Sequence, residues 1–222
     1  MENTGNNLPI APDTRALILS AFIHHILENG QEPASVYKFA QSLGITEAEF
    51  YTYYTSFQGV KGGIWEHVFD ETLGIMHAQE VYQTYSAREK LLSFYYTWIE
   101  VLKKNRSYLL ALYEGHHANL KKAMPAEFRG FRDQFKAFAK GVVAEGKETG
   151  EVADRKYVSD RYEDALWLET LFVFQFWLQD TSTSFEKTDA AIEKSVTLAF
   201  DLIGRTAVDS FVDLAKFLYQ SR

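Results

Sequence analysis

The sequence predicts an all-α protein with a small N-terminal domain, residues 1–61, and a larger C-terminal domain, residues 62–222. Only four prolines occur in the 222 residues, so long stretches remain in which a helix can run without interruption. In those stretches apolar residues recur three and four positions apart, and the strict alternation of a half-buried strand is missing. Helices are therefore the only sustained pattern.

The first expected helix covers residues 13–29, where Asp13 can cap the start and Gly30 the end. A second helix, 34–43, stops at Gly44, a residue that accepts the left-handed conformation of a tight turn. Both helices present apolar stripes to one small core. The stripes are Leu17, Ile18, Ala21, Phe22 and Ile26 in the first helix, and Val36, Phe39, Ala40 and Leu43 in the second.

A third short helix is expected to begin at Thr46. Thr46 followed by Glu49 is typical of a capping box, in which the threonine side chain accepts from the amide of Glu49 and the carboxylate returns to the amide of Thr46. Two short helices joined by a glycine-containing turn and packed on a preceding helix form a helix-turn-helix. A simple helical corner would produce the same pattern.

The rest of the chain predicts further helices separated by short breaks. The first of them carries Ile64, Trp65, Val68, Phe69, Leu73 and Met76 on its inner face and links the two domains. The expected ranges are 62–82, 87–104, 108–123, 125–149, 157–179, 185–205 and 207–220.

Residues 165–178 are apolar nearly all round, which a helix on the surface of a monomer could not be. The following helix adds a stripe of Ile192, Val196, Ala199 and Ile203. The pair is expected to supply half of a two-fold four-helix interface in a homodimer. Burial inside one subunit is the alternative.

Aromatic residues make up 15% of the chain, and most of them have helical spacing. Rings at inward positions either fill the core or line a cavity for an apolar small molecule. The residues expected to line such a cavity are Phe94, Trp98, Tyr113, His116, Phe138, Trp167 and Phe172.

The net charge of −7 argues against a general polyanion binder, so any DNA contact must be local. The chain lacks cysteine, and its first twelve residues lack the apolar segment of a secretory signal. The most apolar stretch, 166–178, is too short to span a bilayer. A cytoplasmic protein without a membrane span is therefore expected.

No catalytic motif is present, since the sequence has neither a nucleophile elbow nor a phosphate-binding loop. Glu114 and His117 have the spacing used in di-iron bundles, but no second Glu-x-x-His accompanies them. We expect no enzyme activity, no metal and no cofactor.

The N-terminal sixty residues resemble the DNA-binding domain of TetR-type transcriptional repressors. The resemblance is carried by Arg15 to Phe22, by Gly30, by Ser35 to Ala40, by the turn Gly44-Ile45-Thr46 and above all by Phe50-Tyr51-Thr52-Tyr53-Tyr54. It implies a homodimeric regulator in which an apolar ligand tilts the helix 62–82 and so changes the spacing of two DNA-binding units.

The resemblance also implies which side chains face DNA. These are Ser35, Lys38, Thr46, Glu47, Tyr51, Thr52 and Lys61, with Phe50 and Tyr54 packed on the core. The sequence departs from the family pattern at Ala48, Glu49 and Phe57. The domain is also net acidic, with Arg15, Lys38 and Lys61 against Asp13, Glu28, Glu32, Glu47 and Glu49.

One short segment resembles a different class of protein. Residues 179–182 and 185–188 resemble the corresponding part of lipid-binding ubiquinone-biosynthesis proteins, which share this overall fold. An interhelical loop that caps the next helix explains the same residues. The alternative function is therefore a carrier for a lipid or isoprenoid that has the fold but does not bind DNA.

Overall fold

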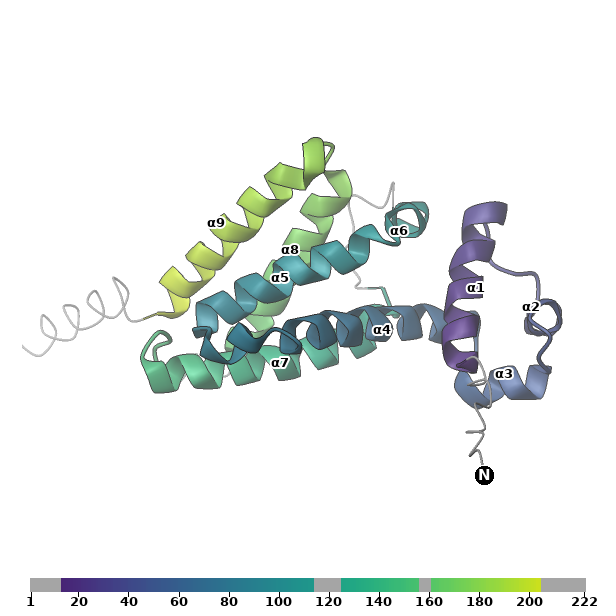
Figure 1. Ribbon diagram of the computed structural model, residues 1–222, viewed down its shortest axis with the longest axis horizontal. Coiled ribbons are helices and arrows are strands. Elements are labelled where there is room, and N and C mark those ends of the chain that lie inside the picture. The colour runs from purple at the N-terminus through teal and green to yellow at the C-terminus, as the bar shows by residue number, and fades with distance from the viewer. Residues whose placement is uncertain (1–12, 114–124, 156–160, 205–222) are drawn as a thin grey trace, which may run out of the picture. The chain divides into compact units, whose positions relative to one another are not determined.

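A computed structural model describes residues 13–113, 125–155 and 161–204. Over these residues the chain forms α-helices and short 3-10 helices without a strand, which confirms the predicted all-α class (Figure 1). None of their helices is both long and apolar enough to cross a membrane. The elements are α1 (Thr14–Asn29), α2 (Val36–Ser42), α3 (Glu47–Tyr53), α4 (Phe57–His77), η1 (Glu80–Thr84), α5 (Ala87–Lys103), α6 (Arg106–Tyr113), α7 (Phe128–Thr149), α8 (Tyr162–Gln179), η3 (Thr183–Phe185) and α9 (Glu186–Ile203).

The chain divides into two compact units, residues 1–64 and 65–222. Helix α4 runs through this division without a break, so no linker separates the units. The predicted domain boundary after Lys61 falls within the same helix and stays a prediction.

Unit 1 is built from α1 to α3 and the start of α4. Asp13 caps α1 by accepting from the amide of Arg15 at 3.0 Å, and Gly30 ends the helix in the left-handed region with φ 65°. Gly44 has φ 71° in the turn between α2 and α3, where a side chain would strain the backbone. The predicted helix-turn-helix is therefore formed.

Helix α4 begins at Phe57, five residues before the predicted start at residue 62. Gly59 was expected to precede the helix but lies within it, as does Gly63, which the predicted range already included. A Cβ on Gly63 would stand 2.5 Å from the hydroxyl oxygen of Tyr54. The glycine therefore allows the Tyr54 ring to pack on the helix, and this tertiary requirement cannot be read from the local pattern.

Unit 2 encloses a core of large aromatic rings contributed by α4 to α8. Trp98 stacks on Phe131 at a centroid distance of 5.4 Å, and Trp65 lies 4.4 Å from Phe128. All four of these side chains are almost fully buried. Ring contacts at this spacing add directional attraction to the burial of apolar area.

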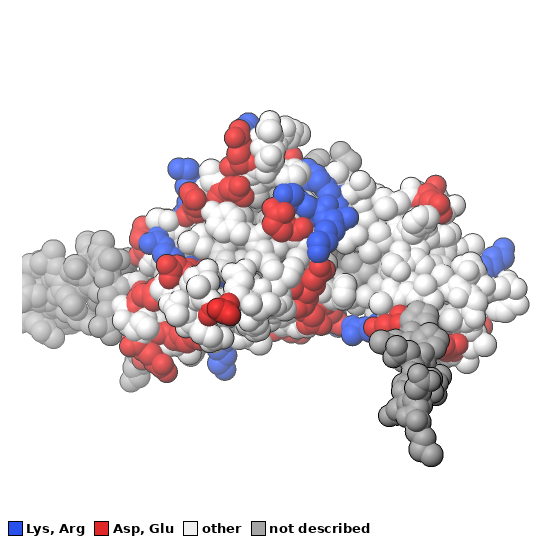
Figure 2. Space-filling model, in the orientation of Figure 1, with Lys and Arg blue, Asp and Glu red and all other residues white. Residues whose placement is uncertain are grey.

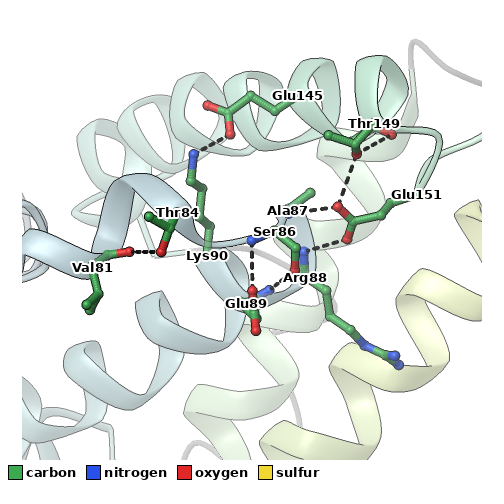
Figure 3. A network of polar contacts seen from close by, with 11 residues as sticks. Val81, Thr84, Ser86, Ala87, Arg88, Glu89, Lys90, Glu145, Thr149 and Glu151 are labelled. Atoms are coloured by element: carbon green, nitrogen blue, oxygen red, sulfur yellow. Dashed lines mark hydrogen bonds and ion pairs between the residues drawn. The ribbon is translucent and has the colours of Figure 1, made fainter.

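The start of α5 is fixed by two carboxylates (Figure 3). Ser86 and Glu89 form a complete capping box, with bonds of 2.8 and 3.3 Å. Glu151, which follows α7, accepts from the amides of Ala87 and Arg88 at 3.2 and 3.3 Å. These bonds satisfy amides that the first turn of a helix otherwise leaves without partners, and they tie α5 to the end of α7.

The turn between α8 and α9 is organised by Asp180. Its carboxylate accepts from the amides and hydroxyls of Ser182 and Thr188, at 2.8 and 2.6 Å and at 2.9 and 2.6 Å. Burial raises the pKa of Asp180, but these four bonds outweigh it and hold the pKa at about 2. The guanidinium of Arg106 donates to the carbonyls of Trp177, Leu178 and Asp180, which closes the end of α8.

Most predicted helices are present with shifted ends. The expected 125–149 and 157–179 begin at Phe128 and Tyr162, and 185–205 is shortened to Glu186–Ile203. The expected 108–123 begins at Arg106, but its second half lies outside the described residues, as does the expected helix 207–220.

Candidate functional site

Helix α3 presents most of its side chains to solvent. Phe50 and Tyr54 are buried and hold the helix on unit 1, as predicted from the sequence. The ring of Phe50 packs edge-on against that of Phe39, with centroids 6.2 Å apart. Tyr54 also accepts a hydrogen bond from the Arg15 guanidinium at 3.1 Å. The remaining surface of α3 is free to meet a partner.

Two of the residues predicted to face DNA cap the helices that carry them. Ser35 accepts from the amide of Lys38 at 3.2 Å, and Thr46 accepts from the amide of Glu49 at 3.1 Å. The return bond from Glu49 to Thr46 is not among the bonds of the described residues, so only half of the predicted capping box is present here. Glu49 is exposed on α3.

The exposed face of α3 is polar and aromatic. Tyr51 is 48% exposed, and its hydroxyl donates to Glu47 at 3.4 Å, the outer limit of a hydrogen bond. The hydroxyl of Thr52 donates back to the carbonyl of Ala48 at 3.2 Å. These groups can exchange such bonds for contacts to base edges or phosphates. Exposed Tyr53, which the sequence reasoning did not single out, extends this face.

Positive charge is sparse in unit 1. The Lys61 ammonium lies 2.5 Å from the Glu32 carboxylate, and its side chain is mostly buried. Lys38 is exposed on α2. On the face drawn in Figure 2, unit 1 is mostly white, and its Lys and Arg atoms stand at separate points instead of forming a patch. DNA contact here would rest on few cations.

The residues predicted to line a ligand cavity meet in the aromatic core of unit 2. Phe94 stacks on Phe138 at 5.0 Å and on Trp98 at 6.1 Å, and Phe131 lies 5.6 Å from Trp167. A ligand among them would have to separate rings that are in contact. Their role in binding therefore stays a prediction.

Tyr113 belongs to the same core and adds a polar path to it. Trp65 donates to the Tyr113 hydroxyl at 3.1 Å, and that hydroxyl donates to Glu127 at 3.0 Å. Burial, and after it the charge of Glu127, raises the pKa of Tyr113 well above its usual value. The phenol therefore remains a donor at neutral pH and links α4 to α6 and to the residue before α7.

Two predicted cavity residues do not join this cluster. Phe172 is 49% exposed on α8 and packs at 6.0 Å on Phe176, away from the core. His116 lies outside the described residues. The core also contains the indole N–H of Trp98, a buried donor for which the described residues supply no acceptor.

A broad groove of about 740 Å³ runs between α8 and α9 on the outer surface of unit 2. Its walls are almost entirely apolar, and its lining includes three large exposed side chains, namely Phe172, Leu198 and Leu202. Such a continuous apolar surface marks an interaction site on a soluble protein. Within the part of the chain that the structure describes, the apolar helix predicted at 165–178 is therefore covered on one side only.

The stripe of α9 predicted to face another subunit was wrong at two of its four residues, Ile192 and Val196. Ile192 and Val196 are buried inside unit 2, whereas Ala199 and the largely buried Ile203 line the groove. The outward stripe consists of Leu198 and Leu202 with smaller residues between them. Both faces of α9 carry apolar residues, so periodicity alone could not distinguish the inner from the outer one.

Glu169 lies in this groove and was not predicted as functional. Both of its carboxylate oxygens are shielded from solvent, and neither has a hydrogen-bond partner in the described part of the chain. Burial raises the pKa of Glu169 to about 7, while the nearby Ser195 hydroxyl opposes that rise. Its signal in the sequence was a carboxylate within a very apolar helix.

Among the described residues, no group of three His, Asp or Glu side chains is placed to hold a metal ion.

Comparison with known proteins adds the family context. A model of the C-terminal domain of tetracycline repressor-like proteins matches residues 90–218. No curated protein matches the chain. Several solved structures share the fold, among them the following three. A protein from Rhodococcus sp. assigned to the TetR family of transcriptional regulators has 15% identity and a TM-score of 0.58, covering 84% of this chain and 98% of its own.

The other two are equally remote in sequence. A protein of unknown function from Rhodococcus sp. RHA1 has 12% identity and a TM-score of 0.54, covering 90% of this chain and all of its own. A transcriptional regulator from Cytophaga hutchinsonii ATCC 33406 has 17% identity and a TM-score of 0.51, covering 86% of this chain and 98% of its own.

Proposed function

This chain belongs to the tetracycline repressor-like family of transcriptional regulators, and from that membership we propose that it binds operator DNA in the cytoplasm as a dimer controlled by an apolar small ligand. The activity is binding without a chemical step. The observation that carries the proposal is the exposed helix α3 of a well-formed helix-turn-helix in the same chain as the family's C-terminal domain.

DNA recognition is assigned to the exposed side chains of α2, α3 and the start of α4. Tyr51 and Thr52 are suited to contact base edges or phosphates because their hydroxyls are engaged only within their own helix. Lys38 is the exposed cation closest in sequence to α3 and contacts phosphate. Ser35 and Thr46 orient the two helices through their caps, and Glu47 accepts from a cytosine amino group.

Dimerisation is assigned to the groove between α8 and α9. An exposed apolar face of this kind is unfavourable in water, and a two-fold partner presenting the same face removes it from solvent. Phe172 and Leu198, from the two helices, are 49% and 59% exposed and would be covered. Phe172→Glu should then give a monomer in sedimentation, whereas the wild type sediments as a dimer at micromolar concentration.

Ligand control is assigned to the aromatic core of unit 2. The hydrogen-bonded path from Trp65 through Tyr113 to Glu127 connects that core to α4, which continues into unit 1. A molecule that separates the rings would shift this path and tilt α4. The indole N–H of Trp98, for which the described residues supply no acceptor, favours a ligand that carries one acceptor on an otherwise apolar body.

The deciding experiment is an unbiased selection of DNA fragments by the purified protein at low and at moderate salt. Specific binding survives the increase in salt, whereas contacts made only to phosphate are lost. Enrichment of one palindromic sequence, abolished by Tyr51→Ala, supports the regulator.

The second candidate is a carrier for a lipid or isoprenoid, and the Lys61 to Glu32 ion pair favours it because that pair removes a cation from the DNA-facing side. If the carrier is correct, no fragment is enriched, and native mass spectrometry finds a long apolar molecule bound to the purified protein. Tyr51→Ala then leaves that cargo unchanged.

A further inference from the structure

The groove between α8 and α9 carries very few charged groups. Its lining includes one carboxylate, Glu169, and two ammonium groups, Lys187 and Lys194. Tyr95 of α5 approaches Glu169 from the inner side, where its own hydroxyl is shared with Thr170 at 3.1 Å. Lys136 of α7 donates to Asp164 in the first turn of α8, so its ammonium is paired there and not with Glu169.

Among the described residues, the nearby Ser195 hydroxyl opposes the rise in the pKa of Glu169, but neither carboxylate oxygen has a hydrogen-bond partner. The Ser195 hydroxyl beside it donates to the carbonyl of Ile192 at 3.2 Å. No ion pair joins Glu169 to Lys187 or Lys194 among the described residues. A shielded carboxylate without a hydrogen-bond partner is costly, and a surface that covered the groove with apolar groups alone would raise that cost.

We propose that Glu169 forms an intersubunit ion pair with Lys194 of the partner subunit, so that two symmetric pairs set the register of the α8 and α9 interface. The inference rests on the proposed dimer. It adds the charged contact by which one subunit recognises the matching face of the other. In a two-fold interface the same patch meets itself, so a face that carries one buried carboxylate and one cation at the same level is self-complementary.

Lys194 fits this role better than Lys187. It immediately precedes Ser195, the α9 residue beside Glu169, and is therefore at the level of Glu169 along the antiparallel pair of helices. Lys187 lies in the first turn of α9, where its amide is bonded to Ser182 at 3.2 Å. A two-fold axis that passes between Glu169 and Lys194 brings Lys194 of the partner subunit to the carboxylate oxygens of Glu169.

The test is a charge exchange followed by sedimentation velocity over a range of concentrations. Glu169→Lys and Lys194→Glu should each weaken the dimer by at least about tenfold, because each puts like charges opposite one another in a dry interface. The double variant Glu169→Lys with Lys194→Glu reverses both members and should recover most of the lost affinity. Circular dichroism of each variant checks that the helices remain folded.

Lys187→Glu is the matched control, since it makes the same charge change at the end of the groove. A wild-type monomer would reject the proposed dimer itself. A wild-type dimer with no recovery in the double variant would overturn the ion pair alone. The ion pair is also overturned if Lys187→Glu weakens the dimer as much as Lys194→Glu does. Glu169→Gln distinguishes a missing charge from a misplaced one, and unchanged or tighter association in that variant also overturns the pairing.

Discussion

The ammonium of Lys61 lies 2.5 Å from the carboxylate of Glu32 within unit 1. The pair joins the first half of α4 to the loop between α1 and α2. Lys61 was predicted to contact phosphate, yet in this arrangement its charge is already balanced. Any DNA complex that uses Lys61 must therefore break or share this ion pair.

Glu32→Gln should release Lys61 and raise non-specific DNA affinity by about three- to tenfold at low salt, with the salt slope increasing by about one. Fluorescence anisotropy with a random duplex measures both quantities. Glu28→Gln is the control, because it removes one negative charge from α1 where the carboxylate faces His24 at 3.2 Å instead. Equal gains from the two variants would mean that only net charge matters.

The sequence predicted unit 1 well because its signals are local. Asp13, Gly30 and Gly44 act through their own backbone neighbourhoods, and each occupies the expected cap or turn. The start of α4 was misjudged because Gly59 looks like a helix breaker in sequence, yet it lies within the helix. Gly63 was expected in the helix, but its packing against Tyr54 could not be predicted from local sequence.

Gly63→Ala should destabilise the protein by about 1–3 kcal/mol, because the new methyl meets the Tyr54 ring and disturbs the Tyr54 bond to Arg15. Gly74→Ala in the same helix has open space around the new Cβ and should stabilise by about 0.5–1 kcal/mol. Urea unfolding of both variants gives the comparison. A loss at both positions would show that α4 itself, and not the Tyr54 contact, is sensitive.

Unit 2 was harder to predict because its stripes are ambiguous. The segment around Phe172 is apolar on both sides, and sequence alone assigned that residue to the inner cavity although it lies on the outer groove. Trp98 was correctly placed inside, but whether rings fill or line a space depends on distances that periodicity does not encode. Glu169 was visible only as an interruption of an apolar run.

Asp180→Asn should destabilise unit 2 by about 2–4 kcal/mol, since an amide cannot accept all four bonds that the carboxylate receives. The carboxyl has a folded pKa near 2, below its ordinary 3.8, so its contribution is present above about pH 4 and is lost as pH falls toward 2. Thermal unfolding between pH 2 and 6 should show this loss in the wild type and not in the variant.

Asp189→Asn, on the neighbouring turn of α9, is the control for that experiment. Burial, followed by the charge of Glu100, raises the pKa of Asp189, so its ionised form contributes no comparable stability. The variant should be neutral or slightly more stable at pH 7. A large loss in Asp189→Asn would indicate that α9 tolerates no substitution there, and that the effect at Asp180 is not specific.

The intersubunit ion pair makes the association depend on pH with a definite sign. In the free chain burial holds the pKa of Glu169 near 7, so below that pH the carboxyl is mostly protonated. Pairing with Lys194 of the partner subunit requires the ionised form, and each dimer therefore releases up to two protons as it assembles. The dissociation constant should fall by up to about 100-fold per pH unit between pH 5.5 and 7 and level off above, because the proton count then no longer changes. Sedimentation equilibrium across this range measures the slope, and Glu169→Gln, which cannot titrate, should flatten it. Tighter association at acid pH would mean that the carboxyl is neutral in the dimer and that Lys194 of the partner subunit does not reach it.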